Sequence, residues 1–205
     1  MLGEKEALDM LTLRHSRSRG FTIVELLVTV TVLGIVLMLG LPNMSAWLQN
    51  TQIRSSAEAM VSGLQLARTE ALRRNRQVRF NVVDTLDAGC NLIATGGSWV
   101  VSMADPSGKC NVDPSEIDDP FIVQKHSGQD STQNVAVSAS ASTVLFNGLG
   151  SAGAPVQFAL TNPNGGTCQQ SGGAMRCLQI NVSASGSVRM CDPAVGDLTD
   201  PRKCP

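Results

Sequence analysis

The chain has 205 residues and a formal net charge of −1, with 42% hydrophobic but only 3% aromatic residues. That length allows one ordinary domain beside a long helical segment. From residue 80 to the end, six Lys or Arg stand against 11 Asp or Glu, which gives this part a net charge of −5. Such a surface repels phosphates unless its few cations cluster, so the composition argues against a general nucleic-acid-binding role.

The first organised stretch is an apolar run of 21 residues, 21–41, in which Glu25 is the single ionisable side chain. A helix of that length covers about 30 Å, the thickness of the hydrocarbon core of a bilayer. We therefore predict a single-pass membrane helix at residues 21–42, with residues 1–20 in the cytoplasm and the remainder on the far side of the membrane. A carboxylate inside such a helix is costly, so Glu25 is expected to have a designated partner. The orientation follows from the arginines that precede the run: Arg14, Arg17 and Arg19.

Two simpler explanations of this run fit less well. A secretory signal peptide has a shorter apolar core followed by a small-residue cleavage site, whereas here Gly-Leu-Pro-Asn-Met follows a long run. An ordinary membrane anchor accounts for the length and the arginines, but not for the sequence Gly-Phe-Thr-Ile-Val-Glu that begins at Gly20.

After Pro42 the apolar residues recur at spacings of three and four, which predicts an amphipathic half of the same helix at residues 43–76. Pro42 is expected to kink the helix or to melt it locally. The basic run at residues 73–76 suits a helix C-terminus. Contact of this run with a membrane surface or with nucleic acid is the alternative. The predicted buried stripe is Ile53, Ala57, Met60, Leu64, Ala67 and Ala71.

From residue 77 the apolar period changes to two, which predicts a β-rich head at residues 77–205. The fold class is therefore α+β, with a long N-terminal helix packed on a mostly antiparallel β-sheet. Residues 127–142 are rich in Ser, Thr, Gln and Ala and are expected to be largely irregular. The expected strands are residues 77–83, 98–103, 121–125, 135–138, 143–146, 156–160, 176–182 and 187–190.

All six cysteines lie in the head, and an even number in an exported domain indicates disulfides, with fifteen possible connectivities. Pairing of sequence neighbours gives Cys90–Cys110, Cys168–Cys177 and Cys191–Cys204, the last of which would close the C-terminal tail into a loop. A metal site is the alternative. It is disfavoured because there is no Cys-x-x-Cys and His126 is the one histidine after residue 20.

No pattern in the sequence indicates catalysis. A nucleophile needs a base nearby, and His126 is expected to be a solvated loop residue. There is no Gly-x-Ser-x-Gly motif and no Gly-rich phosphate-binding loop, so we predict no enzyme, no cofactor and no metal. The acidic stretch at residues 113–119 lacks the regular alternation of a calcium loop. It is expected to be a solvated loop, with calcium binding as the alternative.

Residues 19–28, Arg-Gly-Phe-Thr-Ile-Val-Glu-Leu-Leu-Val, resemble the class III prepilin leader and N-terminal helix of type IV pilins and type II secretion pseudopilins. In that family a membrane peptidase cuts after the glycine and methylates the new N-terminal phenylalanine. The resemblance implies that residues 1–20 are the leader, with cleavage between Gly20 and Phe21 and N-methylation of Phe21. It implies further that the membrane is the inner membrane and that the head lies in the periplasm before it joins a pilus or pseudopilus. It also implies that Glu25 acts in assembly, by pairing with the N-terminal amine of a neighbouring subunit.

Residues 50–57 and 64–74 resemble the GspH/FimT branch of minor pilins and minor pseudopilins, and the resemblance implies the type IV pilin fold. The expected function is that of a structural minor pilin, similar to FimT and FimU, in the tip or priming complex of a type IV pilus. Its expected partners are the prepilin peptidase and N-methyltransferase, other pilin subunits, the inner-membrane assembly platform, and lipid before assembly. The alternative is the minor pseudopilin H of type II secretion; the cysteine-closed tail favours the pilus.

A third function follows from the same resemblance. Some FimT-like proteins bind DNA for uptake through a Gly-Arg-x-Arg motif near the C-terminus. Here the matching residues are Gly186-Ser187-Val188-Arg189, which keep only one arginine. Together with the acidic head, this departure argues against DNA as a partner and leaves Arg189 as the one possible DNA contact.

Overall fold

The computed structural model describes residues 20–131 and 134–205, without the side chains of residues 39–43 and 130–131. The chain divides into two compact units, Met1–Leu41 and Pro42–Pro205. Of the expected leader, only Gly20 lies within the described residues. The second unit is the head together with the second half of the long helix.

The long helix α1 spans Ile23–Arg74 and begins with a side-chain cap. The Oγ1 of Thr22 accepts a hydrogen bond of 3.2 Å from the backbone N–H of Glu25, as in a helix N-cap. The backbone is helical on both sides of Pro42, so it is not melted there, and the kink stays a prediction. In the part of the chain that the structure describes, no helix is long and apolar enough to cross a membrane. The membrane-spanning half of the helix at residues 21–42 stays a prediction.

The C-terminus of α1 is closed by its own backbone. Asn75 adopts a left-handed conformation with φ of 48°, and its N–H donates to the carbonyl of Leu72. The N–H of Arg76 donates to the carbonyl of Ala71 at 3.2 Å. This pair of bonds satisfies helix carbonyls that would otherwise be unpaired, and it ends α1 close to the predicted position.

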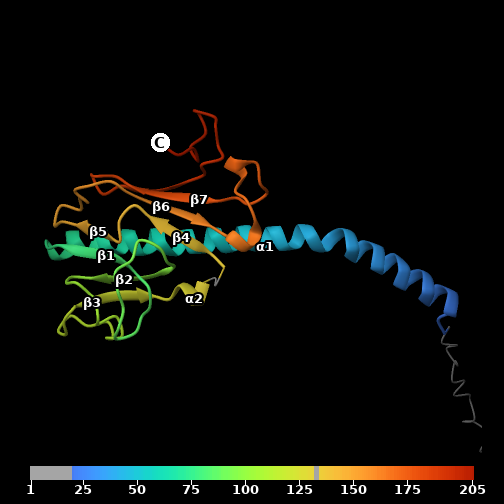
Figure 1. Ribbon diagram of the computed structural model, residues 1–205, viewed down its shortest axis with the longest axis horizontal. Coiled ribbons are helices and arrows are strands. Elements are labelled where there is room, and N and C mark those ends of the chain that lie inside the picture. Colours follow the sequence, from blue (N-terminus) through green and yellow to red (C-terminus); the bar gives the residue numbers. More distant parts are fainter. Residues whose placement is uncertain (1–19, 132–133) are drawn as a thin grey trace, which may run out of the picture. The chain divides into compact units, whose positions relative to one another are not determined.

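The head contains two antiparallel four-stranded sheets rather than one (Figure 1). The strand order in the first sheet is β3-β2-β1-β5, and in the second it is β4-β6-β7-β8. Two 3-10 turns, Pro163–Gly165 and Gln169–Ser171, precede β7. The strands are β1 Val78–Val83, β2 Ser98–Ser102, β3 Ile122–His126, β4 Ala136–Ala139, β5 Thr143–Phe146, β6 Val156–Thr161, β7 Leu178–Val182 and β8 Val188–Cys191.

The α+β class and the positions of all eight expected strands are confirmed, with shifts of one or two residues at their ends. Two local details differ from what the sequence predicts. The stretch at residues 127–142, where β4 was expected in a largely irregular segment, also contains the short helix α2, Gly128–Ser131. His126 is not a solvated loop residue: it ends β3 and stacks on Trp99, with ring centroids 5.1 Å apart.

The main core lies between α1 and both sheets, and the predicted stripe of six apolar residues on α1 is buried in it. In Figure 1, β2 and β3 of the first sheet lie below the second half of α1, and β6 and β7 of the second sheet lie above it. Phe80 of β1 joins the two sheets, because its ring lies 5.2 Å from Trp99 of β2 and 6.0 Å from Phe158 of β6, measured between centroids. One apolar face of α1 therefore packs against both sheets.

A smaller core covers the other face of the first sheet. Val83, Val100 and Ile122 point away from α1 and pack against the disulfide Cys90–Cys110. The loops that follow β1 and β2 are turn-rich and have few apolar residues, so this disulfide gives them a buried anchor. Such a cross-link stabilises a fold mainly by limiting the freedom of the unfolded chain.

Gly63 marks a close approach of α1 to the first sheet. A Cβ atom on Gly63 would lie 2.6 Å from the Cη2 atom of Trp99, whose side chain is buried. The glycine is therefore required by packing, although glycine weakens a helix by about 1 kcal/mol relative to alanine.

We predict that Gly63→Ala lowers the free energy of unfolding of the head by about 1–3 kcal/mol, because overpacking outweighs the gain in helix propensity. Urea unfolding followed by the fluorescence of Trp99 measures the change. The matched control is Ser62→Ala, at the neighbouring exposed helix position, which should leave stability unchanged or slightly raised. A stabilised Gly63→Ala variant would show that the indole has room to move.

Candidate functional site

The N-terminal segment presents an uncovered apolar surface. Phe21 is 80% exposed, Ile23 is 82% exposed, and the large apolar side chains from there to Met38 are all more than half exposed. Gly20 and Phe21 precede the first turn of α1, and Glu25 lies within that turn. A helix with no apolar face buried in its own chain needs lipid or other helices as its surroundings.

Three disulfides cross-link the head: Cys90–Cys110, Cys168–Cys177 and Cys191–Cys204. Each joins two cysteines that follow one another in the order of cysteines along the chain. Among the described residues, no group of three or more His, Cys, Asp or Glu is placed to hold a metal ion. The cysteines therefore serve as covalent links between loops and strands, including the link that fixes the tail to β8.

The C-terminal tail folds back on the end of β8. The backbone N–H of Asp192 donates to the carbonyl of Arg202 at 2.7 Å, beside the disulfide Cys191–Cys204. Arg189, the possible DNA contact, is exposed on β8, and its Nη2 donates to the carbonyl of Pro201 at 3.2 Å. Arg189 thus takes part in holding the tail.

Gly186, at the start of the same Gly-Ser-Val-Arg sequence, has a structural reason for lacking a side chain. Its φ of 81° is left-handed, and a Cβ atom there would collide with the carbonyl oxygen of Gly150. The glycine therefore serves a tight turn before β8, where it approaches the loop after β5.

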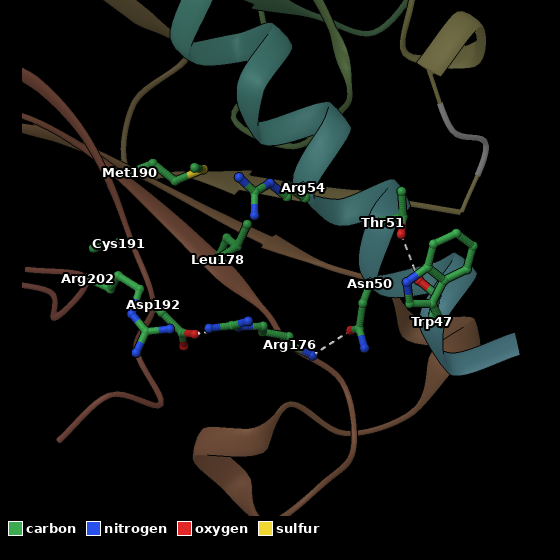
Figure 2. A pocket seen from close by; sticks show the side chains of 10 residues that line it. All are labelled: Trp47, Asn50, Thr51, Arg54, Arg176, Leu178, Met190, Cys191, Asp192 and Arg202. Carbon is green, nitrogen blue, oxygen red and sulfur yellow. Dashed lines mark hydrogen bonds and ion pairs between the residues drawn. The ribbon is translucent and has the colours of Figure 1, made fainter. Parts of the chain in front are cut away.

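A groove of about 410 Å³ lies between α1, the strands β7 and β8, and the tail (Figure 2). We call it the arginine groove, because three of its lining residues are Arg54, Arg176 and Arg202. The remaining lining residues are Trp47, Asn50, Thr51, Leu178, Met190, Cys191 and Asp192. Sequence reasoning missed this site, because its residues come from four separate segments. The exposed Trp47 on the helix was the one available signal.

Hydrogen bonds between these segments fix the shape of the groove. The backbone N–H of Arg176 donates to Oδ1 of Asn50 at 2.8 Å, which joins the start of β7 to α1. The Nε of Arg176 donates to Oδ2 of Asp192 at 2.8 Å, and the side chain of Asp192 is only 5% exposed. In Figure 2 the carboxylate of Asp192 lies between the guanidinium groups of Arg176 and Arg202.

A second ionic cluster lies at the C-terminal end of α1. Glu70 accepts hydrogen bonds from Nη2 of Arg73 at 2.8 Å and from Nε of Arg74 at 2.7 Å. The hydrogen bond from Arg73 is the main cause that holds the pKa of Glu70 below its ordinary value. Arg74 also donates from Nη2 to Glu116 at 2.6 Å, which fastens the acidic stretch to α1. Arg73 and Arg74 of the basic run are thus paired with carboxylates of the same chain.

The acidic stretch at residues 113–119, called the acidic loop below, is ordered by such contacts. The Oγ of Ser115 accepts hydrogen bonds of 3.1 Å from the N–H groups of Ile117 and Asp118. Lys109 forms an ion pair with Asp119. The carboxylates have partners within the protein and do not converge on a common point, as calcium ligands would.

Arg202 lines the arginine groove. Its Nε and Nη2 donate hydrogen bonds to the carboxylate of Asp200 at 3.1 Å and 2.6 Å. These bonds lower the pKa of Asp200 from 3.8 to about 2. The folded tail therefore gains stability from this carboxylate above the unfolded pKa of 3.8, and loses it as the pH falls through about 2.

We predict that the carboxyl carbon of Asp200, followed by NMR in the folded protein, titrates with a midpoint of about 2. In Arg202→Gln the midpoint should return towards 3.8, because the charged donor is removed. Lys203→Gln removes a neighbouring cation and serves as the control, with no change expected. An ordinary midpoint in the unmodified protein would mean that the pair does not form in solution.

Two family models match the chain. The model of the type II transport protein GspH matches residues 56–186, which is more than half of the chain. The model of the prokaryotic N-terminal methylation motif matches residues 15–41. The two matches lie in separate parts of the chain, one over the start of α1 and one over the head. No curated protein matches the chain.

Solved structures of two pilin-type proteins are similar to it at low identity. The type IV minor pilin FimU of Pseudomonas aeruginosa (strain PAO1) has a TM-score of 0.48 and 17% identity, over 68% of this chain and 88% of that chain. The minor pseudopilin EpsH from the type 2 secretion system of Vibrio cholerae has a TM-score of 0.44 and 9% identity, over 70% of this chain and 99% of that chain. The family assignment rests on the two sequence models.

Proposed function

The chain belongs to the GspH family of type II transport proteins, and we propose that it is a minor pilin-type subunit with a structural role and no catalytic one. The observation that carries this proposal is the presence of the methylation motif at residues 15–41 ahead of the GspH match in one chain. The motif spans Gly20 and Phe21, which supports cleavage between them and methylation of Phe21 by a prepilin peptidase. The mature chain then starts directly before α1.

We further propose that the N-terminal segment holds the subunit at the inner membrane, with the head in the periplasm, until an assembly platform inserts it into a filament. The exposed apolar side chains between Phe21 and Met38 support this, since lipid and then neighbouring helices would cover them. Three disulfides in the head support an oxidising compartment for that part of the chain.

Glu25 is proposed to guide assembly. In an apolar surrounding an ionised carboxylate is costly unless an opposite charge lies nearby. Cleavage after Gly20 would create such a charge, the amine of Phe21, on every neighbouring subunit. Pairing of Glu25 with the amine of an adjacent subunit would set the axial position of each helix as it enters the filament.

We predict that Glu25→Ala leaves leader removal intact but reduces incorporation into filaments to a few per cent or less, because an unpaired amine is then left in the apolar core. Intact mass of the membrane form checks processing, with loss of residues 1–20 and gain of one methyl group. Immunoblots of sheared filaments check incorporation. Thr29→Ala, in the same exposed apolar segment, is the control. Normal incorporation of the Glu25 variant would contradict the proposed pairing.

The filament that we propose is a type IV pilus, and the disulfide-closed tail supports this choice. The tail adds an exposed loop between Cys191 and Cys204, a surface suited to contacts between a subunit and its surroundings. The second candidate is the pseudopilus of a type II secretion system, which the description of the matching family favours. DNA uptake is the least supported function, since Arg189 binds the tail and no second arginine accompanies it.

Deletion of the gene in the native host is expected to reduce surface pili at least tenfold, while secretion of exoproteins continues. Electron microscopy and shearing yields measure the pili, and culture supernatants measure secretion. Complementation with the unmodified gene should restore piliation, and the Glu25→Ala gene should not. Lost secretion with normal pili would instead identify a pseudopilus subunit.

A further inference from the structure

The arginine groove combines an apolar floor with unused hydrogen-bond donors. Trp47 is 62% exposed, and Leu178 and Met190 line the same groove from the strands β7 and β8. An arginine side chain has five N–H donors. In the described part of the chain, the side-chain hydrogen bonds of Arg54 and Arg176 each use Nε alone. The groove therefore fits an apolar side chain that is flanked by carboxylates.

The acidic loop presents that combination at the surface of the same protein. Ile117 is 86% exposed, and it stands between Glu116 and Asp118, which are also exposed. An isoleucine displayed in this way gains free energy when a partner covers it. The loop is held in one shape by Ser115 and by the ion pair of Glu116 with Arg74, so little conformational entropy is lost on binding.

The groove and the loop lie far apart on one molecule. Arg54 lines the groove, and Arg74, which binds the acidic loop, follows 20 positions later on α1. At 1.5 Å per residue this separation is about 30 Å along the helix axis. The two surfaces therefore cannot meet within one copy. Contact between the groove of one copy and the loop of the next leaves a free groove and a free loop at the two ends, which permits stacking in a row.

We propose that the arginine groove receives the acidic loop of a second copy of this chain. Ile117 of one copy packs on Trp47, Leu178 and Met190 of the other. The carboxylates of Glu116 and Asp118 face the guanidinium groups of Arg54 and Arg176. The inference deepens the proposed function and rests on it, since it names a contact between stacked subunits.

Single-stranded nucleic acid is the other ligand class for a groove with tryptophan and arginine. Such sites use several aromatic rings in series and a continuous basic path for the backbone. This groove has one aromatic ring, and its three arginines line it together with Asp192 and do not form a continuous basic path. The apolar floor favours an aliphatic side chain.

Photo-crosslinking in the full-length chain tests the proposal, because one side chain in a groove does not hold a stable dimer in dilute solution. The photoreactive residue p-benzoylphenylalanine replaces Ile117 in cells that express two differently tagged copies. We expect a product that contains both tags, with the crosslink mapped to Trp47, Leu178 or Met190. The control places the same photoreactive residue at Leu149, which is 84% exposed; it should not reach the groove.

Two groove variants sharpen the test. Trp47→Ala and Arg54→Glu change exposed side chains, and each should lower the yield of the crosslink about tenfold. Their unfolding midpoints should match that of the unmodified head, so that a lower yield reflects the contact. Crosslinks that reach only other proteins, or that are unchanged in both variants, overturn the proposal. Tight, salt-sensitive binding of a single-stranded oligonucleotide that is lost in Trp47→Ala overturns it in favour of nucleic acid.

The readouts of this contact are separate from those of the proposed function. Failure of the filament role appears as normal pili and secretion after deletion, whatever the crosslinks show. Failure of the contact alone appears as a missing crosslink in a strain in which the subunit still enters filaments.

Discussion

The head depends on one constraint: a single apolar stripe on α1 must pack against two sheets at the same time. Its six buried residues lie three or four positions apart, so they form one face of the helix. Phe80 completes the arrangement by touching Trp99 in its own sheet and Phe158 in the other. Neither sheet has a second helix to cover it among the described residues, apart from the four-residue α2. Gly63 allows α1 to approach Trp99 of the first sheet closely, because a side chain there would collide with the indole.

The periodicity of the sequence was sufficient to predict the elements but not their partners. An alternation of two identifies Val78–Val83 as a strand and says nothing about which strand lies beside it. The division into two sheets is therefore a tertiary property, set by how the inward residues of β1 and β6 meet α1. His126 shows the same limit, because its surroundings depend on Trp99, which lies 27 positions earlier in the chain.

The net charge of the head also hides how its charged residues are distributed. The head is acidic from residue 80 onwards, yet the three arginines of that part, Arg176, Arg189 and Arg202, all lie in the last 30 residues of the chain. Each of them holds the tail or its neighbourhood in place, through Asp192, the carbonyl of Pro201 and Asp200 respectively. The motif at Gly20, Phe21 and Glu25 could be recognised from the sequence because it is local. The arginine groove could not, because folding assembles it.

The covalent links of the head have a mechanical consequence. All six cysteines follow α1 in the sequence, so the three disulfides tie loops and strands to one another and none of them reaches the helix. Apart from the backbone that leads from Arg74 into β1, a pulling force that enters through α1 therefore passes to the rest of the head through packed side chains and hydrogen bonds. Tension along the helix axis would load the whole stripe in shear, so that all its contacts share the force before any of them slips.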